Sequence, residues 1–452
     1  MSSNWREKAK QRRRISRRRL LAGAMAAVPA PLLVPGRALG LGGQMAPSER
    51  ITIAMFGVGN RGSSSLRAMQ PLADHQVVAI ADCRRSRALL AQEQVNRFYS
   101  ERLGTESFKG CRVYNDFRDV LARGDVDAVW GCVPDHWHGV VYSRVIESGK
   151  DLYGEKPVTR WIAQGIKVRD AVRRYGCVFQ TGTQQRSSPH FRHACELAVS
   201  GYLGKVHTVY VGAPGGRSYP VEPPCDPPEG FDYDMWTGPA PYLPFDNKRC
   251  EWLAMYMISH YCAGFITNWG VHHLDIAGWG CPEIFREPFE VEGTGVLPED
   301  GMTDTWIWWQ MTLRWKSGLV MSFTNTGNPN EQGCKFVGDE GWVHANRKGI
   351  WAEPASLLEV RLKPGDTRLH ASPEHDNPYT AHTADFFRSI RTRQDPVSPV
   401  EAGHAASTLG NVSDIALRLG RKLKWDPRQD CFIGDDEANA MLSRALRSPW
   451  TI

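Results

Sequence analysis

One stretch near the start of the chain constrains the fold more than any other, residues 51–82. A short apolar run rich in β-branched side chains leads into Gly57, Gly59 and Gly62, spaced as GxGxxG, and a helical segment follows. A second apolar run, VVAIA, then ends at Asp82. Strand, glycine-rich turn, helix and strand in this order predict a parallel βαβ unit, and the fingerprint within it is typical of dinucleotide binding.

Each glycine of this fingerprint has a separate role. Gly57 permits a tight turn, Gly59 lets the backbone approach a pyrophosphate, and Gly62 lets the helix pack closely on the strand. The helix begins near Asn60 and Arg61, and the free N–H groups and dipole at its N-terminus favour an anion. We therefore expect these residues to hold the phosphates of a dinucleotide, rather than to form a turn with only a structural role.

The acidic residue that completes the fingerprint indicates which dinucleotide binds. Asp82 lies 20 residues beyond Gly62, at the end of the second predicted strand. A carboxylate there can accept hydrogen bonds from a ribose 2′-hydroxyl and repel a 2′-phosphate, which favours NAD over NADP. Arg84 and Arg85 follow at once and offer positive charge for a 2′-phosphate, so NADP stays open.

The basic residues of the chain are concentrated at its N-terminus. Residues 1–40 carry ten Lys and Arg against one acid, a local charge of +9, so the formal net charge of +6 leaves −3 for the remainder and indicates no nucleic-acid partner. Paired arginines, an apolar stretch and a small-residue region follow one another as in a twin-arginine signal peptide. The apolar stretch is shorter than the roughly 20 residues of a membrane-spanning helix. We therefore expect no stable membrane span, export through the twin-arginine machinery and a periplasmic location.

Polar residues follow two further predicted strands. The apolar run at 126–133 leads directly into Pro134 and His138, and the short run at 151–154 leads into Glu155. Ligands in doubly wound sheets bind outside the carboxyl ends of the strands. We therefore expect Pro134, His138 and Glu155 to face the cofactor.

Several motifs together resemble those of the glucose–fructose oxidoreductase / inositol dehydrogenase / MocA (Gfo/Idh/MocA) family. They are the glycine fingerprint, PDHWH at 134–138, EKP at 155–157, WTGPAP at 236–241, GVHHLD at 270–275 and LKWDP at 423–427. The resemblance extends over residues 50–450. It implies an α/β chain with an N-terminal Rossmann dinucleotide-binding domain, followed by an α/β domain with a large open mixed or antiparallel sheet.

The resemblance also implies a catalytic pair. Lys156 would bind the substrate hydroxyl and tune proton transfer, and the proline after it keeps the lysine in extended backbone. His272 would take the proton from that hydroxyl, with Asp275 supporting it from the same helix. The alternatives are an exposed lysine in a turn and a structural histidine.

One position departs from the family pattern. Inositol dehydrogenase-like members have an aspartate four residues before the histidine, where this chain has Asn268. An amide can orient a hydroxyl but cannot relay a proton at neutral pH, which puts a simple Lys–Asp–His dehydrogenase mechanism in doubt. Tyr261, seven residues earlier, is either a further hydroxyl group at the substrate or a buried structural tyrosine.

Other side chains are candidates for the substrate side. Gln185 and Arg186 follow a turn where two domains would meet, and either hydrogen-bond a polyol or lie on a solvated loop. Trp236 offers an aromatic platform for a sugar or the nicotinamide. His272, Asp275 and neighbouring histidines could instead hold a metal. Such sites do not usually accompany a dinucleotide fingerprint, and the eleven cysteines show no metal-binding spacing, so we expect no metal.

We divide the chain into four parts. They are a signal peptide at 1–40, a Rossmann NAD-binding domain at 50–176, an α/β substrate and oligomerisation domain at 177–430, and a C-terminal tail at 431–452. Helices predicted at 383–391 and 402–419 could return to cover the first domain.

Within the second domain, alternation over 305–315 predicts a strand with two different faces. One face is apolar, with Ile307, Trp309, Met311, Leu313 and Trp315, and the other is half-polar, with Trp306, Trp308, Gln310, Thr312 and Arg314. Two tryptophans on a half-polar face favour a subunit contact, with a sugar-stacking face and a solvated face as the alternatives. We therefore expect a homo-oligomer formed through this sheet.

Together these features predict a periplasmic oxidoreductase that acts on a carbohydrate secondary alcohol and passes hydride to NAD or NADP. Free NAD is expected to be scarce outside the cytoplasm, so we expect the cofactor to be loaded before export and tightly bound. Two alternatives stay open. One is a redox-neutral NAD-dependent glycoside hydrolase or lyase that acts through a transient keto-sugar. The other is a non-catalytic sugar-binding protein on a dehydrogenase fold.

Overall fold

A computed structural model describes residues 45–326 and 331–452. The predicted signal peptide at 1–40 lies outside these residues. The chain divides into two compact units, residues 1–50 and residues 51–452. The described part of the first unit contains the short 3-10 helix η3 (Pro47–Glu49). In the described ranges, no helix is long and apolar enough to cross a membrane.

Six parallel strands open the second unit and form a sheet in the order β3-β2-β1-β4-β5-β6. They are β1 (Ile51–Phe56), β2 (His75–Ala81), β3 (Arg112–Tyr114), β4 (Ala128–Gly131), β5 (Asp151–Gly154) and β6 (Phe179–Thr181). The strand order reverses beside β1, where such sheets bind ligands outside the carboxyl ends of their strands. The predicted Rossmann fold is confirmed. Its sheet takes in β6, just beyond the boundary predicted after residue 176.

Helices connect these parallel strands, as βαβ units require. They are α2 (Asn60–Met69), α3 (Arg85–Leu103), α4 (Phe117–Leu121), α5 (His138–Glu147) and α6 (Ile162–Tyr175), with the 3-10 turns η4 (Asp135–Trp137) after β4 and η5 (Gln184–Ser187) after β6. The start of α2 places Asn60 and Arg61 in its first turn, directly after the glycine loop.

Nine strands form the second sheet, in the order β13-β12-β11-β7-β10-β9-β8-β14-β15. They are β7 (Val206–Ala213), β8 (Phe289–Val296), β9 (Trp308–Trp315), β10 (Val320–Asn325), β11 (Gly333–Gly338), β12 (Gly341–Asn346), β13 (Gly349–Glu353), β14 (Leu423–Asp426) and β15 (Cys431–Phe432). Only β7 and β10 pair in parallel, so the sheet is mixed, as predicted. The predicted tail at 431–452 contributes β15 to this sheet.

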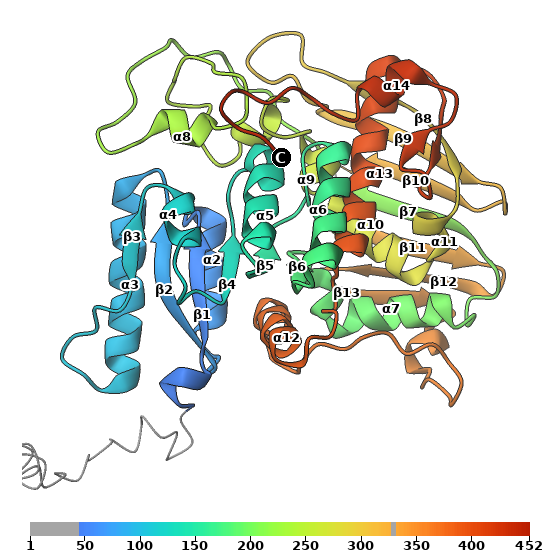
Figure 1. Cartoon of the computed structure of the whole chain (residues 1–452). Helices are drawn as coiled ribbons and strands as arrows, with labels where there is room; N and C mark the ends of the chain where they lie inside the picture. Colours follow the sequence, from blue (N-terminus) through green and yellow to red (C-terminus); the bar gives the residue numbers. More distant parts are fainter. Residues whose placement is uncertain (1–44, 327–330) are drawn as a thin grey trace, which may run out of the picture. The chain divides into compact units, whose positions relative to one another are not determined.

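The remaining helices pack on one face of the second sheet or join the two halves of the unit (Figure 1). They are α7 (Pro189–Val199), α8 (Tyr233–Thr237), α9 (Phe265–Asn268), α10 (Gly270–Gly280), α11 (Glu283–Arg286), α12 (Pro378–Thr392), α13 (Val400–Leu419) and α14 (Asp436–Ala440), with the 3-10 turns η6 (Met255–Met257) and η7 (Ala355–Glu359). Helix α10 is buried along its whole length, between the sheet and α13.

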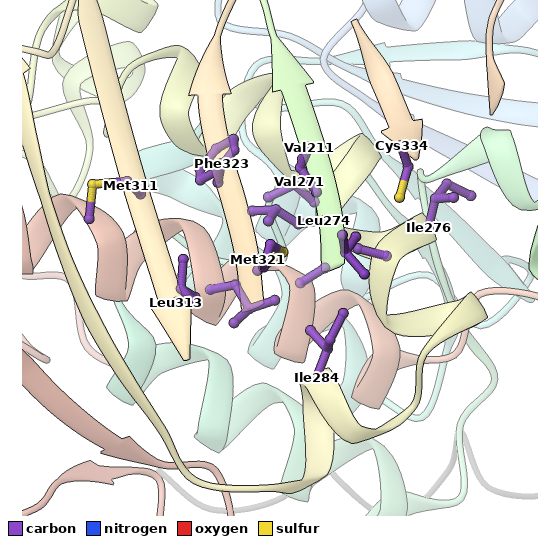
Figure 2. Packing of buried hydrophobic residues seen from close by; sticks show 14 of the residues in the cluster. Val211, Val271, Leu274, Ile276, Ile284, Met311, Leu313, Met321, Phe323 and Cys334 are labelled. Atoms are coloured by element: carbon purple, nitrogen blue, oxygen red, sulfur yellow. The ribbon is translucent and has the colours of Figure 1, made fainter. Parts of the chain in front are cut away.

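Figure 2 shows the apolar core between α10 and the sheet, with Met311 and Leu313 of β9 and Phe323 of β10 among its members. The alternation predicted for β9 is largely confirmed. Met311 and Leu313 are fully buried, and Trp308 on the opposite face is exposed. Trp306 is the exception, because it precedes the strand and is buried, where its Nε1–H donates to Asp414 Oδ1 at 2.9 Å. The half-polar face therefore carries one tryptophan of the two predicted.

The late helices return to the first half of the unit, as predicted. Helix α12 places Phe386 against Trp130 of β4 and Tyr153 of β5, with ring centroids 5.8 and 5.9 Å apart. Gln180 of β6 donates to the carbonyl of His382 on α12 at 2.7 Å. Helix α13 lies between α6 and α10 (Figure 1) and so joins the two halves.

Candidate active site

A cleft of about 670 Å³ follows the carboxyl ends of the first sheet and extends to α9 and α10. Residues after β1, β2, β4 and β5 line one end, and residues of the loop between β7 and α9 line the other. The predicted cofactor residues Gly57, Gly59, Asn60, Arg61, Asp82, Pro134, His138 and Glu155 all border this cleft. Gly62 lies one turn inside α2, behind the loop.

The glycine loop has the space that a dinucleotide requires. A Cβ on Gly57, whose φ is +80°, would lie 2.5 Å from the carbonyl oxygen of Cys132, and one on Gly62 would lie 2.2 Å from that of Gly57. These two glycines permit close packing of backbone. A Cβ on Gly59 would meet only the end of the Arg87 side chain, at 3.4 Å, among the described residues. Gly59 therefore leaves the uncapped N-terminus of α2 open to an anion in the cleft.

Asp82 links the end of β2 to this loop. Its carboxylate accepts from the backbone N–H of Val58 and from that of Arg84, both at 2.8 Å. Burial raises the pKa of Asp82, and these two hydrogen bonds partly offset the rise. The carboxylate still borders the cleft, where it can accept from a ribose hydroxyl. The residues present therefore fit NAD.

Three other predicted cofactor residues are fixed by contacts beside the loop. Arg61 pairs with the carboxylate of Glu155, and its guanidinium lies 4.8 Å from the ring of Tyr379. The ring nitrogens of His138 face the carbonyl of Pro157 at 2.6 Å and that of Val133 at 2.9 Å. His138 therefore holds the segments after β4 and β5 together, at the edge of the cleft.

Lys156 projects from the end of β5 toward α9. Its Nζ donates to the backbone carbonyl of Asn268 at 2.9 Å. Burial lowers the pKa of Lys156, and the charges of Asp135 and Glu155 partly offset this effect. The Asn268 amide lies 3.4 Å from Asp135 Oδ2, so a carboxylate stands close to the asparagine that departs from the family pattern.

His272 borders the cleft from the first turn of α10. It is buried, and its Nδ1 has no hydrogen-bond partner among the described residues. Burial lowers the pKa of His272 well below its ordinary value, and the positive charges of Arg347 and Lys156 lower it further. The imidazole is therefore neutral at neutral pH and able to accept a proton.

Comparison with known protein families agrees with this geometry. Residues 51–183 match the model of the oxidoreductase family with an NAD-binding Rossmann fold, and residues 218–452 match that of the same family's C-terminal alpha/beta domain. The chain belongs to the Gfo/Idh/MocA family of oxidoreductases. The fold and the family expected from the motifs are thereby confirmed.

Known members of the Gfo/Idh/MocA family resemble the chain over most of their length. Myo-inositol 2-dehydrogenase of Thermotoga maritima is 21% identical, over 83% of this chain and 98% of the relative. The structure of aldose-aldose oxidoreductase from Caulobacter crescentus, complexed with glycerol, has a TM-score of 0.59 at 18% identity and covers 83% of this chain and 100% of its own. The structure of levoglucosan dehydrogenase in complex with NADH and levoglucosan has a TM-score of 0.59 at 16% identity and covers 83% of this chain and 99% of its own.

The structure places four predicted substrate contacts of this family member outside the residues that line the cleft. Arg186 and Asp275 form a buried pair, with distances of 2.7 and 2.8 Å between guanidinium nitrogens and carboxylate oxygens. Asp275 lies one turn beyond His272 on a helix that is buried on all sides, so it faces η5 and not the cleft. The pair joins η5 to α10.

Gln185 and Tyr261 also lie outside the residues that line the cleft. The Gln185 amide donates to Nδ1 of His273 at 3.1 Å and faces the carbonyl of His272 at 3.3 Å. Tyr261 is buried, with its ring centroid 4.8 Å from that of Trp236. Its interpretation as a structural tyrosine is therefore the better one. Trp236 itself lines the cleft, as predicted.

Sequence reasoning missed several residues that line the substrate end. They are Tyr256, Trp269, Arg347 and Tyr379. Asp135 and Gln184 also line the cleft. Asp135 begins η4, four residues after the end of β4, within the PDHWH motif noted in the sequence, and Gln184 directly precedes Gln185. Arg347 lies in the turn between β12 and β13, where no local pattern indicates a site. Among the described residues, no group of His, Cys, Asp and Glu is arranged to hold a metal ion.

Proposed function

We propose that this oxidoreductase removes hydride from a secondary alcohol of a carbohydrate, with NAD as the acceptor. The observation that supports the proposal is the meeting of Lys156 and the unpartnered His272 at one cleft, whose other end is the glycine loop. The inositol, aldose and levoglucosan enzymes among its relatives favour a carbohydrate. Asp82 favours NAD, while Arg84 and Arg87 at the same end keep NADP as the second choice.

His272 and Lys156 have separate roles at the oxygen of the substrate hydroxyl. The neutral imidazole of His272 accepts the proton of the substrate hydroxyl, and the Lys156 amine hydrogen-bonds the same oxygen as negative charge develops on it. Bound NAD supplies the acceptor for the hydride that leaves the carbon. Asn268 orients the lysine through its backbone carbonyl, and its amide, next to Asp135, takes no proton.

The loop between β7 and α9 supports a tightly bound cofactor. Asp232 donates its N–H to the carbonyl of Cys83 at 2.9 Å, and its carboxylate accepts from Asn115 at 2.8 Å. The guanidinium of Arg84 lies 4.0 Å from the ring centroid of Phe231. These contacts pin the loop beside Asp82, where it limits the escape of the adenosine half of NAD.

We infer that the enzyme works with retained cofactor outside the cytoplasm, after export through the segment at 1–40. At an association rate of about 10⁶ M⁻¹s⁻¹, a bound lifetime of hours corresponds to a dissociation constant in or below the nanomolar range. A cofactor that stays bound can cycle only when each hydride is returned. The reaction is then a paired oxidation and reduction of two sugars, or a redox-neutral glycoside cleavage through a transient keto-sugar.

The test begins with extensive dialysis of the folded protein, followed by measurement of its nicotinamide content. Stoichiometric cofactor is expected, together with conversion of sugars when no NAD is added. Absorbance of the reduced nicotinamide should rise with the first substrate and fall with the second, and product analysis distinguishes paired redox from glycoside cleavage. An empty protein that accumulates NADH only with millimolar added NAD would contradict retention and leave a conventional dehydrogenase.

A further inference from the structure

Three cations that line the cleft lower the pKa of His272 by their charge, and their partners differ. Arg61 is paired with Glu155. Lys156 is accompanied by Asp135, whose charge partly restores its pKa. Arg347 makes no ion pair with any acid among the described residues. Its one hydrogen bond within them runs from Nε to the neutral Oε1 of Gln185, at 3.3 Å.

Arg347 is held in place despite lacking an acidic partner. Its guanidinium lies 4.5 Å from the ring centroid of Trp269, the residue that precedes α10. Gln185, which accepts from its Nε, also holds the first turn of α10 through His273. A planar guanidinium held over an aromatic ring through one nitrogen keeps its Nη donors for an anion, which it can bind at two points.

Arg347 lies in the same cleft as His272, the proposed proton acceptor. Trp269, His272 and Arg347 line the same cleft, and the charge of Arg347 contributes to the low pKa of His272, second to burial. Desolvation lowers the pKa of Arg347, and Tyr379 and Glu155 partly offset this effect. Because Arg347 is exposed at the cleft, its guanidinium is accessible to a substrate anion.

We propose that Arg347 forms an anion subsite and that the substrate is a sugar carrying a negatively charged group near the hydroxyl that is oxidised. This rests on the proposed oxidoreductase function. A carboxylate, as in a sugar acid, or a phosphate ester would form an ion pair with the guanidinium, whereas a neutral polyol would form none. Arg347 then selects the substrate and orients it toward His272, and it takes no part in proton transfer.

The experiment compares D-glucuronate, D-glucose 6-phosphate and D-glucose as probes of the full NAD-loaded chain. Reduction of the nicotinamide is followed by absorbance, and binding of each probe by calorimetry. We expect the acidic probe of the correct class to reduce the bound nicotinamide with a second-order rate constant at least about tenfold above that of D-glucose. Arg347→Gln should lower that ratio about 10- to 100-fold, and Arg347→Lys should restore part of it. A response to D-glucuronate identifies the anionic group as a carboxylate, and a response to D-glucose 6-phosphate identifies it as a phosphate ester.

Arg97→Gln is the matched control, because Arg97 is exposed on α3 and does not line the cleft, so the variant should leave the ratio unchanged. Cofactor content of each variant verifies that the fold is intact. Equal use of neutral and acidic probes, or an equal loss for all probes in Arg347→Gln, would overturn the anion subsite while leaving the oxidoreductase. If no probe reduces the nicotinamide, the calorimetric preference and its dependence on Arg347 decide the subsite separately from the reaction.

Discussion

At the scale of single residues, the proposed chemistry depends on a half-buried lysine whose pKa is lowered by desolvation. The Lys156 amine is held by the carbonyl of Asn268 and lies near Asp135, so its charge is stabilised within the cleft while burial lowers its pKa. Such an amine can donate to a substrate oxygen without a large reorganisation of water. Its contribution should appear in turnover and not in the binding of the dinucleotide.

Lys156→Ala is therefore expected to reduce turnover by at least about 100-fold and to leave the bound nicotinamide content close to that of the wild type. Single-turnover absorbance measures the first quantity, and release of nicotinamide on denaturation measures the second. Lys424→Ala is the control, since Lys424 lies on β14 and is exposed. A parallel loss of cofactor and turnover would show that Lys156 serves the dinucleotide.

Local motifs predicted the residues whose role depends on nearby backbone. The glycine loop and Asp82 are determined by one βαβ unit, and Lys156 by the strand end before a proline. Arg347 could not be found in this way, because it reaches the cleft only when the turn between β12 and β13 lies against Trp269. Asp275 lies on the helix of His272, as expected, but pairs with Arg186, and spacing along a helix does not reveal which neighbour faces each side.

At the scale of elements, the loop between β7 and α9 is tied down by the end of the chain. Arg447 donates from Nη1 to the Asp234 carboxylate at 2.6 Å and from Nε to the carbonyl of Gly238 at 2.7 Å. Trp450 then packs edge-on against Trp137, with centroids 4.6 Å apart. In Figure 1 the chain terminus lies beside α8 and α5. Helix α8 is therefore held at Asp232 by the segment after β2 and at Asp234 by Arg447 of the C-terminal segment.

Arg447→Ala should loosen α8 and release NAD at least about tenfold faster, because one side chain makes the contacts that hold Asp234 and Gly238. The rate is measured by trapping released NAD with a coupled enzyme after dilution. Arg428→Ala removes an ion pair away from α8, that with Glu287, and should have no effect. Unchanged release from Arg447→Ala would mean that the loop is held without the terminal segment.

Strong apolar runs allowed most parallel strands, as well as β9 and β10, to be predicted within a few residues. Strands β11 and β12 begin with glycine and have weaker alternation, so their sequence alone gave no sign of them. Local sequence pattern also does not predict what packs against the exposed face of the second sheet. Tyr210, Trp308 and Trp351 are exposed, and a homo-oligomer through this sheet stays a prediction.

At the scale of the whole molecule, several histidines are buried in neutral form. Burial lowers the pKa of His136 and of His273 to about 3 and that of His382 to about 4, and lowers that of His272 as well. In the unfolded chain the same imidazoles titrate near 6.5. Between these values the unfolded state binds more protons than the folded state, so stability is complete above the unfolded pKa and declines as the pH falls.

The free energy of unfolding should therefore decrease from pH 6.5 to pH 5, by about 1 kcal/mol per pH unit for each such histidine. Urea titrations at successive pH values measure the decrease, and calorimetry in buffers of different ionisation enthalpy should show proton uptake on unfolding. His207→Asn, at an exposed position, should keep the same profile. Constant stability, or proton release, over this range would contradict the neutral assignment.

The return of α12 to the first sheet has a consequence for how the protein is made. Residues 51–181 leave the ribosome first, yet Phe386 and Phe387, which complete the packing on Trp130 and Tyr153, are synthesised about 200 residues later. At roughly 5–20 residues per second, that face stays bare for ten seconds or more. We therefore expect the packing on this face of the first sheet to be completed only when synthesis of the chain is nearly finished.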